Sequence, residues 1–509
     1  MRNYVFCFYT AAIWLATGTN CSAISFDDLI ASYGNLTTVA GAGQFRGAAY
    51  NGWESSMEGG SALDAELSRP HIAMSDLTGN IYIADKDAHA IRLVSGDGTM
   101  HTVAGTSEAG FNGDAGLATE IQLNSPNGIF TRPDGTTYIY DLGNNRIGKL
   151  SVDGIFTTLF EDFDGMVAGR GLWVNKDETL AYYSSGTELK MWTPDEGVEI
   201  LADGFAELGN LDVNPHDGSL VVTDRLGHGV YKVDANGQKT LVAGNESDSG
   251  GRSGMPATSV GLDEVRGIYF HPEGGYFLAT HKGGQVWFVD EQDTIHLLVD
   301  GDTEHETHYG DGQPLSVPGR KISEPRAVTL APNGDILITE NDFGFIRHVA
   351  ISDPWFELGD FDADGELGVS DINAISQIVQ QQRNVYLYDV TGDGTVTMED
   401  RTHWIKELKQ TNIGDANLDG VFNSGDFVQV FQAGQYEDAI LGNSTWNTGD
   451  WNGDGDFTSA DFVEAFVDGG YVAAATPQNV PEPFWGPGVM FLMTVLVVRF
   501  IRNTPAGSK

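Results

Sequence analysis

The chain has 509 residues and a formal net charge of -44, from 72 acidic and 28 basic residues. This length indicates more than one domain, and a hydrophobic content of 41% is enough for packed cores. The acid excess argues against a nucleic-acid partner, because phosphates require clustered lysines and arginines. It favours cations or solubility in salty surroundings. The 65 glycines indicate many tight turns, as in an all-β chain.

The first 23 residues have the pattern of a signal peptide. Arg2 gives a positive start, residues 4–16 are mostly apolar, and residues 21–23 offer small side chains for cleavage. We therefore expect an exported protein of the cell surface, the periplasm or the extracellular matrix. Both cysteines, Cys7 and Cys21, fall in this segment, so the mature chain would have no disulfide or thiolate chemistry. Lipidation of Cys21 is the weaker alternative, since residues 18–20 lack the usual aliphatic side chain.

A strand–turn–strand segment recurs between residues 35 and 350. Each copy has a turn with Gly, Asp or Asn, an alternating run of β-branched or aromatic residues, a short gap and a second strand. The spacing of roughly 40 to 60 residues is in or slightly above the range of propeller blades. The runs lie at 81–85, 136–141, 179–183 (degenerate), 219–224, 275–280 and 335–340.

Residues 126–129, 138–141 and 144–147 (Pro-Asn-Gly-Ile, Tyr-Ile-Tyr-Asp and Asn-Asn-Arg-Ile) resemble the signature of the NHL-repeat family. This resemblance implies a mainly β fold, a six-bladed β-propeller over residues 35–350. A blade buries both faces only when the blades close into a ring. Residues 36–41 match the outer strands expected at 100–105 and 240–244, and the last blade lacks such a strand. We therefore predict that the N-terminal copy completes the last blade.

Alignment of the repeats places one residue of each blade at the mouth of the central channel. Three of the six are arginines, which are costly together unless they face an anion, a carboxylate or water. The hypothesis is a pocket for an anionic or carbohydrate-like ligand, and ordinary channel lining satisfied by water and nearby acids is the alternative. The six residues are His71, Asn127, Arg170, Asn210, Arg266 and Arg326.

A catalytic propeller is the alternative to a binding module. Six-bladed relatives include metal-dependent lactonases and peptide-amide lyases, whose sites need converging carboxylates or histidines. The histidines at 216, 228, 271 and 281 fall in turns or at strand ends of different blades, and His305 and His308 are expected to be solvated. The sequence has neither a His-x-x-x-His spacing nor a nucleophile elbow. Binding is therefore expected, although a propeller can assemble a site from residues far apart in sequence.

Four twelve-residue loops beginning at Asp360, Asp389, Asp415 and Asp450 have the pattern of EF-hand calcium loops. Oxygen-bearing side chains occupy positions 1, 3, 5 and 12, glycine occupies position 6, and position 7 contributes its backbone carbonyl. Ca²⁺ is the expected cofactor, and acidic solvated turns without metal are the alternative. The predicted ligands are Asp360, Asp362, Asp364, Glu366 and Asp371; Asp389, Thr391, Asp393, Thr395 and Asp400; Asp415, Asn417, Asp419, Val421 and Asp426; and Asp450, Asn452, Asp454, Asp456 and Asp461.

Position 12 is Asp in all four loops, where EF-hand sensors usually carry Glu. In this the region resembles dockerin modules, arranged here as two pairs over residues 360–410 and 415–470. The loop spacing leaves open which loops pair, and the apolar residue at position 8 suits a short β contact between paired loops. Helices are expected at 370–382, 398–409, 426–432 and 461–467. The resemblance implies a cohesin-like partner, and a calcium-stabilised spacer is the alternative.

Residues 480–503 resemble a PEP-CTERM sorting signal. They contain Pro481-Glu482-Pro483, an apolar run at 484–498 and the basic residues Arg499 and Arg502. The resemblance implies contact with the membrane through this segment and processing by an exosortase-type enzyme. A plain C-terminal anchor is the alternative, although the run is shorter than the ~20 residues that span a bilayer. Together these patterns predict an exported surface or matrix scaffold that binds a partner such as a surface polysaccharide.

Overall fold

A computed structural model describes residues 25–472, except 44–49, 216, 273, 304–309, 353–357, 362–364, 383–387, 389 and 392–394. The expected signal peptide and sorting segment lie outside these residues. The described chain forms two compact units, one reaching Gln410 and including Gly453–Gly455, the other beginning at Thr411 and continuing again from Asp456. In the described ranges no helix is long and apolar enough to cross a membrane.

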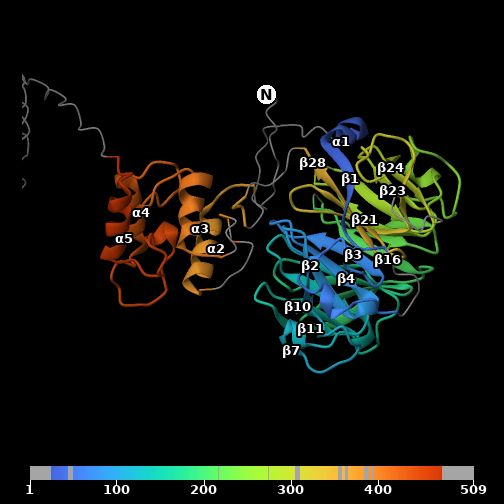
Figure 1. The fold of residues 1–509 in the computed structure, drawn as a ribbon, viewed down its shortest axis with the longest axis horizontal. Helices are drawn as coiled ribbons and strands as arrows, with labels where there is room; N and C mark the ends of the chain where they lie inside the picture. Colours follow the sequence, from blue (N-terminus) through green and yellow to red (C-terminus); the bar gives the residue numbers. More distant parts are fainter. Residues whose placement is uncertain are drawn as a thin grey trace, which may run out of the picture. The chain divides into compact units, whose positions relative to one another are not determined.

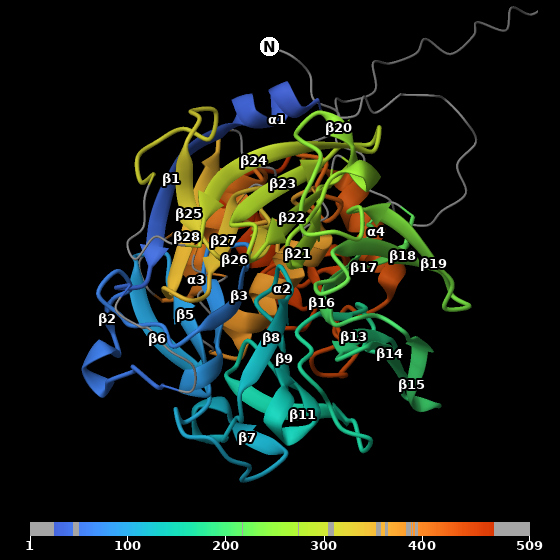
Figure 2. The same cartoon turned by 90° about the vertical axis from the view of Figure 1, so that its right-hand side faces the viewer.

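Six antiparallel sheets make up the larger part of the first unit (Figure 1). Each blade has an inner strand followed by three more strands, and Figure 2 shows the inner strands near the centre and the outer strands at the periphery. The first three blades are β3 (Pro70–Ser75), β4 (Ile81–Asp85), β5 (Ala90–Val94) and β6 (Thr99–Ala104); β8 (Pro126–Thr131), β9 (Thr137–Asp141), β10 (Arg146–Leu150) and β11 (Ile155–Glu161); and β12 (Leu172–Val174), β13 (Ala181–Ser185), β14 (Glu188–Thr193) and β15 (Gly197–Ala202). The last three are β16 (Leu208–Val213), β17 (Leu220–Asp224), β18 (Gly229–Val233) and β19 (Lys239–Ala243); β21 (Val265–Phe270), β22 (Tyr276–Thr280), β23 (Gln285–Val289) and β24 (Thr294–Asp302); and β26 (Pro325–Leu330), β27 (Ile336–Glu340), β28 (Phe345–Ile351) and β1 (Tyr33–Ala40).

Short strands extend the outer edges of three blades. They are β2 (Gly60–Ser61), β7 (Ala115–Leu117) and β20 (Met255–Pro256), while β25 (Arg320–Ser323) runs parallel to β24. The helix α1 (Phe26–Ser32) precedes β1 and is capped by Ser25, whose hydroxyl accepts the amide N–H of Asp28 at 3.2 Å. Its buried Leu29 packs into the core between the fifth and sixth blades.

The ring closes through the first strand of the chain. The inner strands β3, β8, β12, β16, β21 and β26 contact their neighbours around a complete circle. Strand β1 pairs antiparallel with β28, with Thr37 opposite His348. This confirms both the six blades and the predicted use of the N-terminal copy as the outer strand of the last blade.

Six clusters of buried hydrophobic residues hold the propeller together, each shared by two neighbouring blades. Between the second and third blades, Tyr140 of β9 meets Tyr183 of β13 edge to face, with ring centroids 6.0 Å apart. Burial of each large apolar side chain contributes about 1.5–3 kcal/mol. Because one blade's core is completed by the next, stability depends on the ring being complete.

Buried ion pairs fix the turns that lead into the inner strands. In the second blade Arg146 Nε lies 2.8 Å from Asp141 Oδ2, and Asp141 also accepts the amide N–H of Asn124 at 2.7 Å. The first and sixth blades repeat this pairing with Arg92–Asp85 and Arg347–Glu340. The residues that resemble the NHL signature therefore have a structural role. In the third blade, where β13 ends in Ser185, Lys190 pairs instead with Asp162 at 2.7 Å.

A helix follows each of the four predicted calcium loops. These are α2 (Val369–Gln380), α3 (Met398–His403), which continues as a π-helix over Trp404–Leu408, α4 (Ser424–Ala433) and α5 (Ser459–Asp468). All four expected helices are confirmed, although α4 and α5 begin two residues earlier than predicted. Position 9 of each loop is the N-cap, so the position-12 Asp falls in the first helical turn, where a carboxylate is stabilised.

In the second unit, the third and fourth loops are joined indirectly, through the segments that follow their helices. The carbonyl of Phe422, at position 8 of the third loop, accepts the amide N–H of Val472 at 2.8 Å. The carbonyl of Phe457, at the same position of the fourth loop, accepts the N–H of Glu437 at 2.9 Å. Each loop thus pairs with the segment that follows the other loop's helix. This differs from the expected contact between the two position-8 residues, since the described bridge of Phe457 is to Tyr436.

Candidate functional site: the mouth of the central channel

The six predicted channel residues lie where inner strands bulge. Five of the inner strands shift register against the second strand at this point, for example between Val265 and Gly267 around Arg266, and between Pro325 and Ala327 around Arg326. In the third blade Arg170 lies just before β12. A bulge leaves its extra residue outside the ladder and redirects its side chain. The six residues thus occupy equivalent positions at the starts of the inner strands, and their role in ligand binding stays a prediction.

We call these six residues the channel ring. Their exposed fractions are only 2–6%. Each has at least one buried polar atom without a hydrogen-bond partner among the described residues. Buried polar groups are normally paired, so the open atoms indicate a place for water or a ligand. These atoms are Nδ1 of His71, Oδ1 of Asn127, Nε and Nη1 of Arg170, Oδ1 of Asn210, and Nε of Arg266 and Arg326.

The three arginines of the channel ring are poorly compensated. Burial lowers the pKa of Arg170 well below its usual value, and the charges of Arg266 and Arg225 lower it further. Burial also lowers the pKa of Arg326, again reinforced by Arg266 and Arg170. The charge of Arg266 is balanced, because its guanidinium contacts the Glu264 carboxylate. The ring thus has an excess of positive charge within a strongly acidic protein.

Two histidines accept hydrogen bonds from Arg326. Its Nη1 lies 2.7 Å from Nε2 of His71, and its Nη2 lies 3.3 Å from Nε2 of His281. A guanidinium can only donate, so both imidazoles are neutral and accept at Nε2. Burial, together with Arg326, lowers the pKa of His71, and burial lowers the pKa of His281 to about 3. Both rings therefore stay uncharged at neutral pH.

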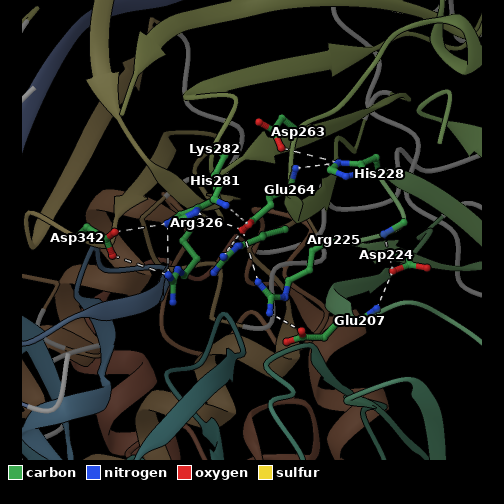
Figure 3. A network of polar contacts seen from close by, with 12 residues as sticks. Glu207, Asp224, Arg225, His228, Asp263, Glu264, His281, Lys282, Arg326 and Asp342 are labelled. Carbon is green, nitrogen blue, oxygen red and sulfur yellow. Dashed lines mark hydrogen bonds and ion pairs between the residues drawn. The ribbon is translucent and has the colours of Figure 1, made fainter. Parts of the chain in front are cut away.

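Glu264 is the centre of the polar network at the mouth (Figure 3). Besides Arg266, its carboxylate contacts Lys282 Nζ at 3.1 Å, Arg225 Nη1 at 3.5 Å and His281 Nδ1 at 3.5 Å. The hydrogen bond from His281 and the cations around it hold the pKa of Glu264 well below its usual range. Figure 3 shows Asp342 and Glu207 on opposite sides of this network.

His281 also lies close to two carboxyl groups, those of Glu324 and Asp342. One ligand atom of each lies within 4.8 Å of the others, and His281 Nε2 is 3.9 Å from Asp342 Oδ2. Burial raises the pKa of Glu324 to about 8, and its hydrogen bond with Asp342 contributes. Hydrogen bonding to Glu324, with His281 and Arg326 nearby, lowers the pKa of Asp342 in spite of its burial. The two carboxyl groups therefore share one proton at neutral pH.

Sequence reasoning missed this group because its members come from three turns. His281 follows β22, Glu324 precedes β26 and Asp342 follows β27. One signal was available: Glu264 and Glu324 occupy the same repeat position, directly before an inner strand. Both adopt a left-handed backbone, with φ of 50° and 47°, as does Ser125 at the same position with 55°. Because Ser125 has the same conformation without an acidic side chain, the left-handed backbone is a feature of the turn and not of the acidic residue.

A small cavity lies beside the channel ring, between the inner strands. Its volume is about 20 Å³, enough for roughly one water molecule. Arg170, Asn210 and Asp212 contribute the polar part of its lining, and burial raises the pKa of Asp212 to about 7. The rest of the lining is mostly apolar, including Ile72, Met74, Ile129, Phe130 and Leu172. This cavity is therefore too small for a ligand larger than water.

The calcium loops share one local geometry. In the third loop Asp426 accepts the amide N–H of Ala416 at 3.0 Å with Oδ1 and that of Asn423 at 2.8 Å with Oδ2. The position-12 residues of the other loops likewise accept amide N–H groups from position 2 or 3 and from position 9: Asp371 with Phe361 and Gly368, Asp400 with Thr391 and Thr397, and Asp461 with Trp451, Asn452 and Thr458. The position-6 glycines Gly365, Gly420 and Gly455 have φ of 83–90°. The loops therefore turn as the pattern predicts.

The described ligand side chains of the predicted calcium loops suit a cation. In the third loop both Asp415 and Asp426 are buried, and burial followed by the nearby Asp415 charge raises the pKa of Asp426. Two neighbouring buried carboxylates suit a divalent ion. Asp360, Asp450 and Asp461 are likewise buried. Four of the predicted ligands, Asp362, Asp364, Asp389 and Asp393, lie outside the described residues.

Comparison with known proteins supports the propeller. No model of a known protein family matches the chain. Mouse Teneurin-3 is 35% identical over 106 residues, 18% of this chain, and human Teneurin-1 is 22% identical over 333 residues, 59% of this chain. The chain spans only 4% and 11% of the length of these curated relatives. A solved Bacteroides thetaiotaomicron protein of unknown function has 15% identity and a TM-score of 0.50, covering 62% of this chain and 76% of its own. The fold is thus a six-bladed β-propeller.

Proposed function

We propose that this protein is an exported surface or matrix protein whose propeller binds an anionic ligand at the channel ring. Arg170 carries the proposal: its side chain is almost fully buried, and its Nε and Nη1 have no acceptor among the residues described. Leaving one buried charge without a partner costs about 3–5 kcal/mol. A carboxylate or sulfate would satisfy one of these two donors with a charge-assisted hydrogen bond, and water or a second oxygen would satisfy the other.

The remaining ring atoms favour an acidic carbohydrate as the ligand. Asn127 and Asn210 each leave Oδ1 open as an acceptor, which suits sugar hydroxyl groups. Arg266 and Arg326 each leave Nε open as a donor, which suits a carboxylate. A surface polysaccharide that carries uronic acids combines both features.

The test is a calorimetric titration of the calcium-loaded, full-length protein with oligogalacturonate and with neutral malto-oligosaccharides. We expect binding of the acidic probe alone. Combined Arg170→Gln, Arg266→Gln and Arg326→Gln substitutions should weaken it at least tenfold, which is about 1.4 kcal/mol. The matched control is Arg320→Gln, since Arg320 is 60% exposed on β25 and pairs with Asp302. Equal binding by the triple variant would refute the pocket.

In the same proposal the C-terminal region is a calcium-stabilised spacer or a dock for a cohesin-like protein. Ca²⁺ would be held by the position-1, -3, -5 and -12 side chains of each loop and would supply charge neutralisation and rigidity there. The repeated geometry of the position-12 carboxylates supports this role. Export by the signal peptide and processing by an exosortase-type enzyme complete the proposal, with the apolar segment at 484–498 in contact with the membrane.

A second candidate is a propeller enzyme acting outside the cytoplasm, either a lactonase-like hydrolase or a peptide-amide-lyase-like enzyme. The Glu324–Asp342 pair favours it, because one protonated and one ionised carboxyl group at a mouth can serve as general acid and base. The assay is hydrolysis of gluconolactone by the purified protein. A rate that Glu324→Gln removes would favour the enzyme, and a rate equal to that of buffer would exclude this substrate.

A further inference from the structure

Three turns place His281, Glu324 and Asp342 together at the mouth. The amide N–H of His281 donates to the carbonyl of Glu264 at 3.0 Å, and the turn after β27 is joined to Glu324 through the N–H of Asn341 at 3.5 Å. The His281 side chain is 7% exposed, whereas that of Asp342 is 39% exposed. The group therefore has a fixed, buried imidazole and a carboxylate that solvent can reach.

The orientation of His281 is that of a metal-ligating histidine. Its Nδ1 points to the Glu264 carboxylate at 3.5 Å, and its Nε2 faces Asp342 Oδ2 at 3.9 Å. Metal-bound histidines commonly donate their second ring N–H to a carboxylate, which fixes the tautomer and aims the other nitrogen at the ion. Here the nitrogen that faces Asp342 is the one that carries a lone pair.

The guanidinium of Arg326 leaves room for an ion on one side. It faces Asp342 through Oδ1 at 3.8 Å, whereas His281 faces Oδ2 of the same carboxylate. An ion between His281 and Oδ2 would replace the 3.3 Å contact of Arg326 with His281 and the hydrogen bond between Glu324 and Asp342. The 2.7 Å contact of Arg326 with His71 would persist. Ligand atoms around tetrahedral zinc lie about 3.4 Å apart, so His281 and Asp342 need to approach by only about half an ångström.

We infer that His281, Glu324 and Asp342 form a binding site for a borderline divalent transition-metal ion, with Zn²⁺ as the first expectation. One imidazole nitrogen and two carboxylate oxygens suit zinc better than calcium or magnesium, which favour oxygen ligands throughout. Three protein ligands leave a position open for water or a ligand oxygen, as in catalytic zinc sites. None of the three ligands belongs to the channel ring, although Arg326 of the ring contacts His281. The site goes beyond the proposed binding function.

The experiment uses the full-length protein, stripped with a chelator and then kept in saturating Ca²⁺ so that the calcium loops are occupied. Zn²⁺ is titrated by calorimetry, and Co²⁺ is added to a second sample to record its visible d–d absorption. We expect one Zn²⁺ per chain beyond calcium and a Co²⁺ spectrum that Zn²⁺ abolishes. Failure of oligogalacturonate to bind would not affect this result, since no carbohydrate is present.

Variants locate the ion. Asp342→Asn, which keeps size at a half-exposed position, and His281→Gln should each weaken Zn²⁺ at least tenfold and remove the Co²⁺ bands. Glu264→Gln should weaken Zn²⁺ by about 10–100-fold through the orientation of His281. The control is His101→Gln, since His101 is a surface histidine 3.4 Å from Glu58. Absence of Zn²⁺ binding in saturating Ca²⁺, or equal binding by Asp342→Asn, would overturn the inference.

Discussion

Two arginines show how surroundings separate structural from functional residues. Arg146 is fully buried, but Nε meets Asp141, Nη1 donates to the carbonyl of Gly113 at 2.7 Å and Nη2 donates to that of Gln122 at 3.2 Å. Arg170 is almost as buried and leaves Nε and Nη1 open. A guanidinium whose N–H groups are all hydrogen-bonded within the protein stabilises the fold. A guanidinium with unbonded N–H groups can bind an acceptor from outside the chain.

Removal of Arg146 should therefore affect stability and leave ligand binding unchanged. Arg146→Met leaves Asp141 as an uncompensated buried carboxylate, which should lower the free energy of unfolding by about 3–5 kcal/mol. The measurement is denaturant unfolding of the propeller. The control is Lys232→Met, whose pair with Asp217 is exposed and should contribute less than about 1 kcal/mol. A loss below that figure in Arg146→Met would contradict the structural role.

Asp212 predicts a pH dependence of stability. Its pKa is raised from 3.8 to about 7 by burial in the channel, so between these values the folded chain binds a proton that the unfolded chain has released. Stability from this group should thus fall as pH rises from 4 to 7. Asp212→Asn should remove that slope in thermal melts, whereas Asp217→Asn, at a half-exposed site, should leave it. A wild-type minus Asp212→Asn difference that does not change with pH would contradict the assignment.

At the scale of elements, the pairing of β1 with β28 joins the two ends of the propeller. Thr37 lies opposite His348, so the contact closes a loop that contains nearly the whole ring. Without β1 the last blade would expose the edge of β28 and part of the core shared with the first blade, where Ala40 is fully buried. Ring closure should therefore limit the stability of all six blades.

An engineered disulfide tests this closure. The change is Thr37→Cys with His348→Cys, at directly opposite positions, in the mature chain without its N-terminal cysteines. Closing so long a loop is worth up to about 5 kcal/mol in chain-entropy terms, so the oxidised protein should melt at least several degrees above its reduced form. Each single-cysteine variant serves as the control. No disulfide under oxidising conditions would contradict the register of β1.

Sequence patterns predicted the strands and the loops more readily than the mouth. The second strands, the closing strand and the channel ring repeat in every blade, so periodicity indicates them directly. The helices after the loops follow from capping and ligand patterns. Glu264 and His281 belong to turns, and their chemistry depends on contacts between the fifth and sixth blades. For Arg146 the sequence shows a family-like motif, but the motif does not reveal that the residue forms an internal ion pair with Asp141.

At the scale of the whole molecule, the buried acids of this strongly acidic chain are of two kinds. In the propeller, buried acids such as Asp85 and Asp141 have arginine partners within the blade. In the third calcium loop, Asp415 and Asp426 are buried together, and their described contacts are with the amides and the Thr411 hydroxyl of their own segment. Cation binding should therefore be needed for the loops and their helices and not for the propeller blades.

Calorimetry of the full-length protein should consequently show two unfolding transitions, of which only one depends on calcium. Ca²⁺ at 100 times its dissociation constant stabilises the folded form by about 2.7 kcal/mol for each site, so chelation should lower that transition and leave the propeller transition in place. Asp461→Asn removes the carboxylate that accepts three amide N–H groups in the fourth loop, and it should reduce the calcium-dependent shift. Glu464→Gln, on the same helix at an exposed position, is the control. A propeller transition that moves with calcium, or a transition of the loop region that does not, would contradict this division of acids between the blades and the loops, because a carboxylate already paired with arginine gains little from an added cation.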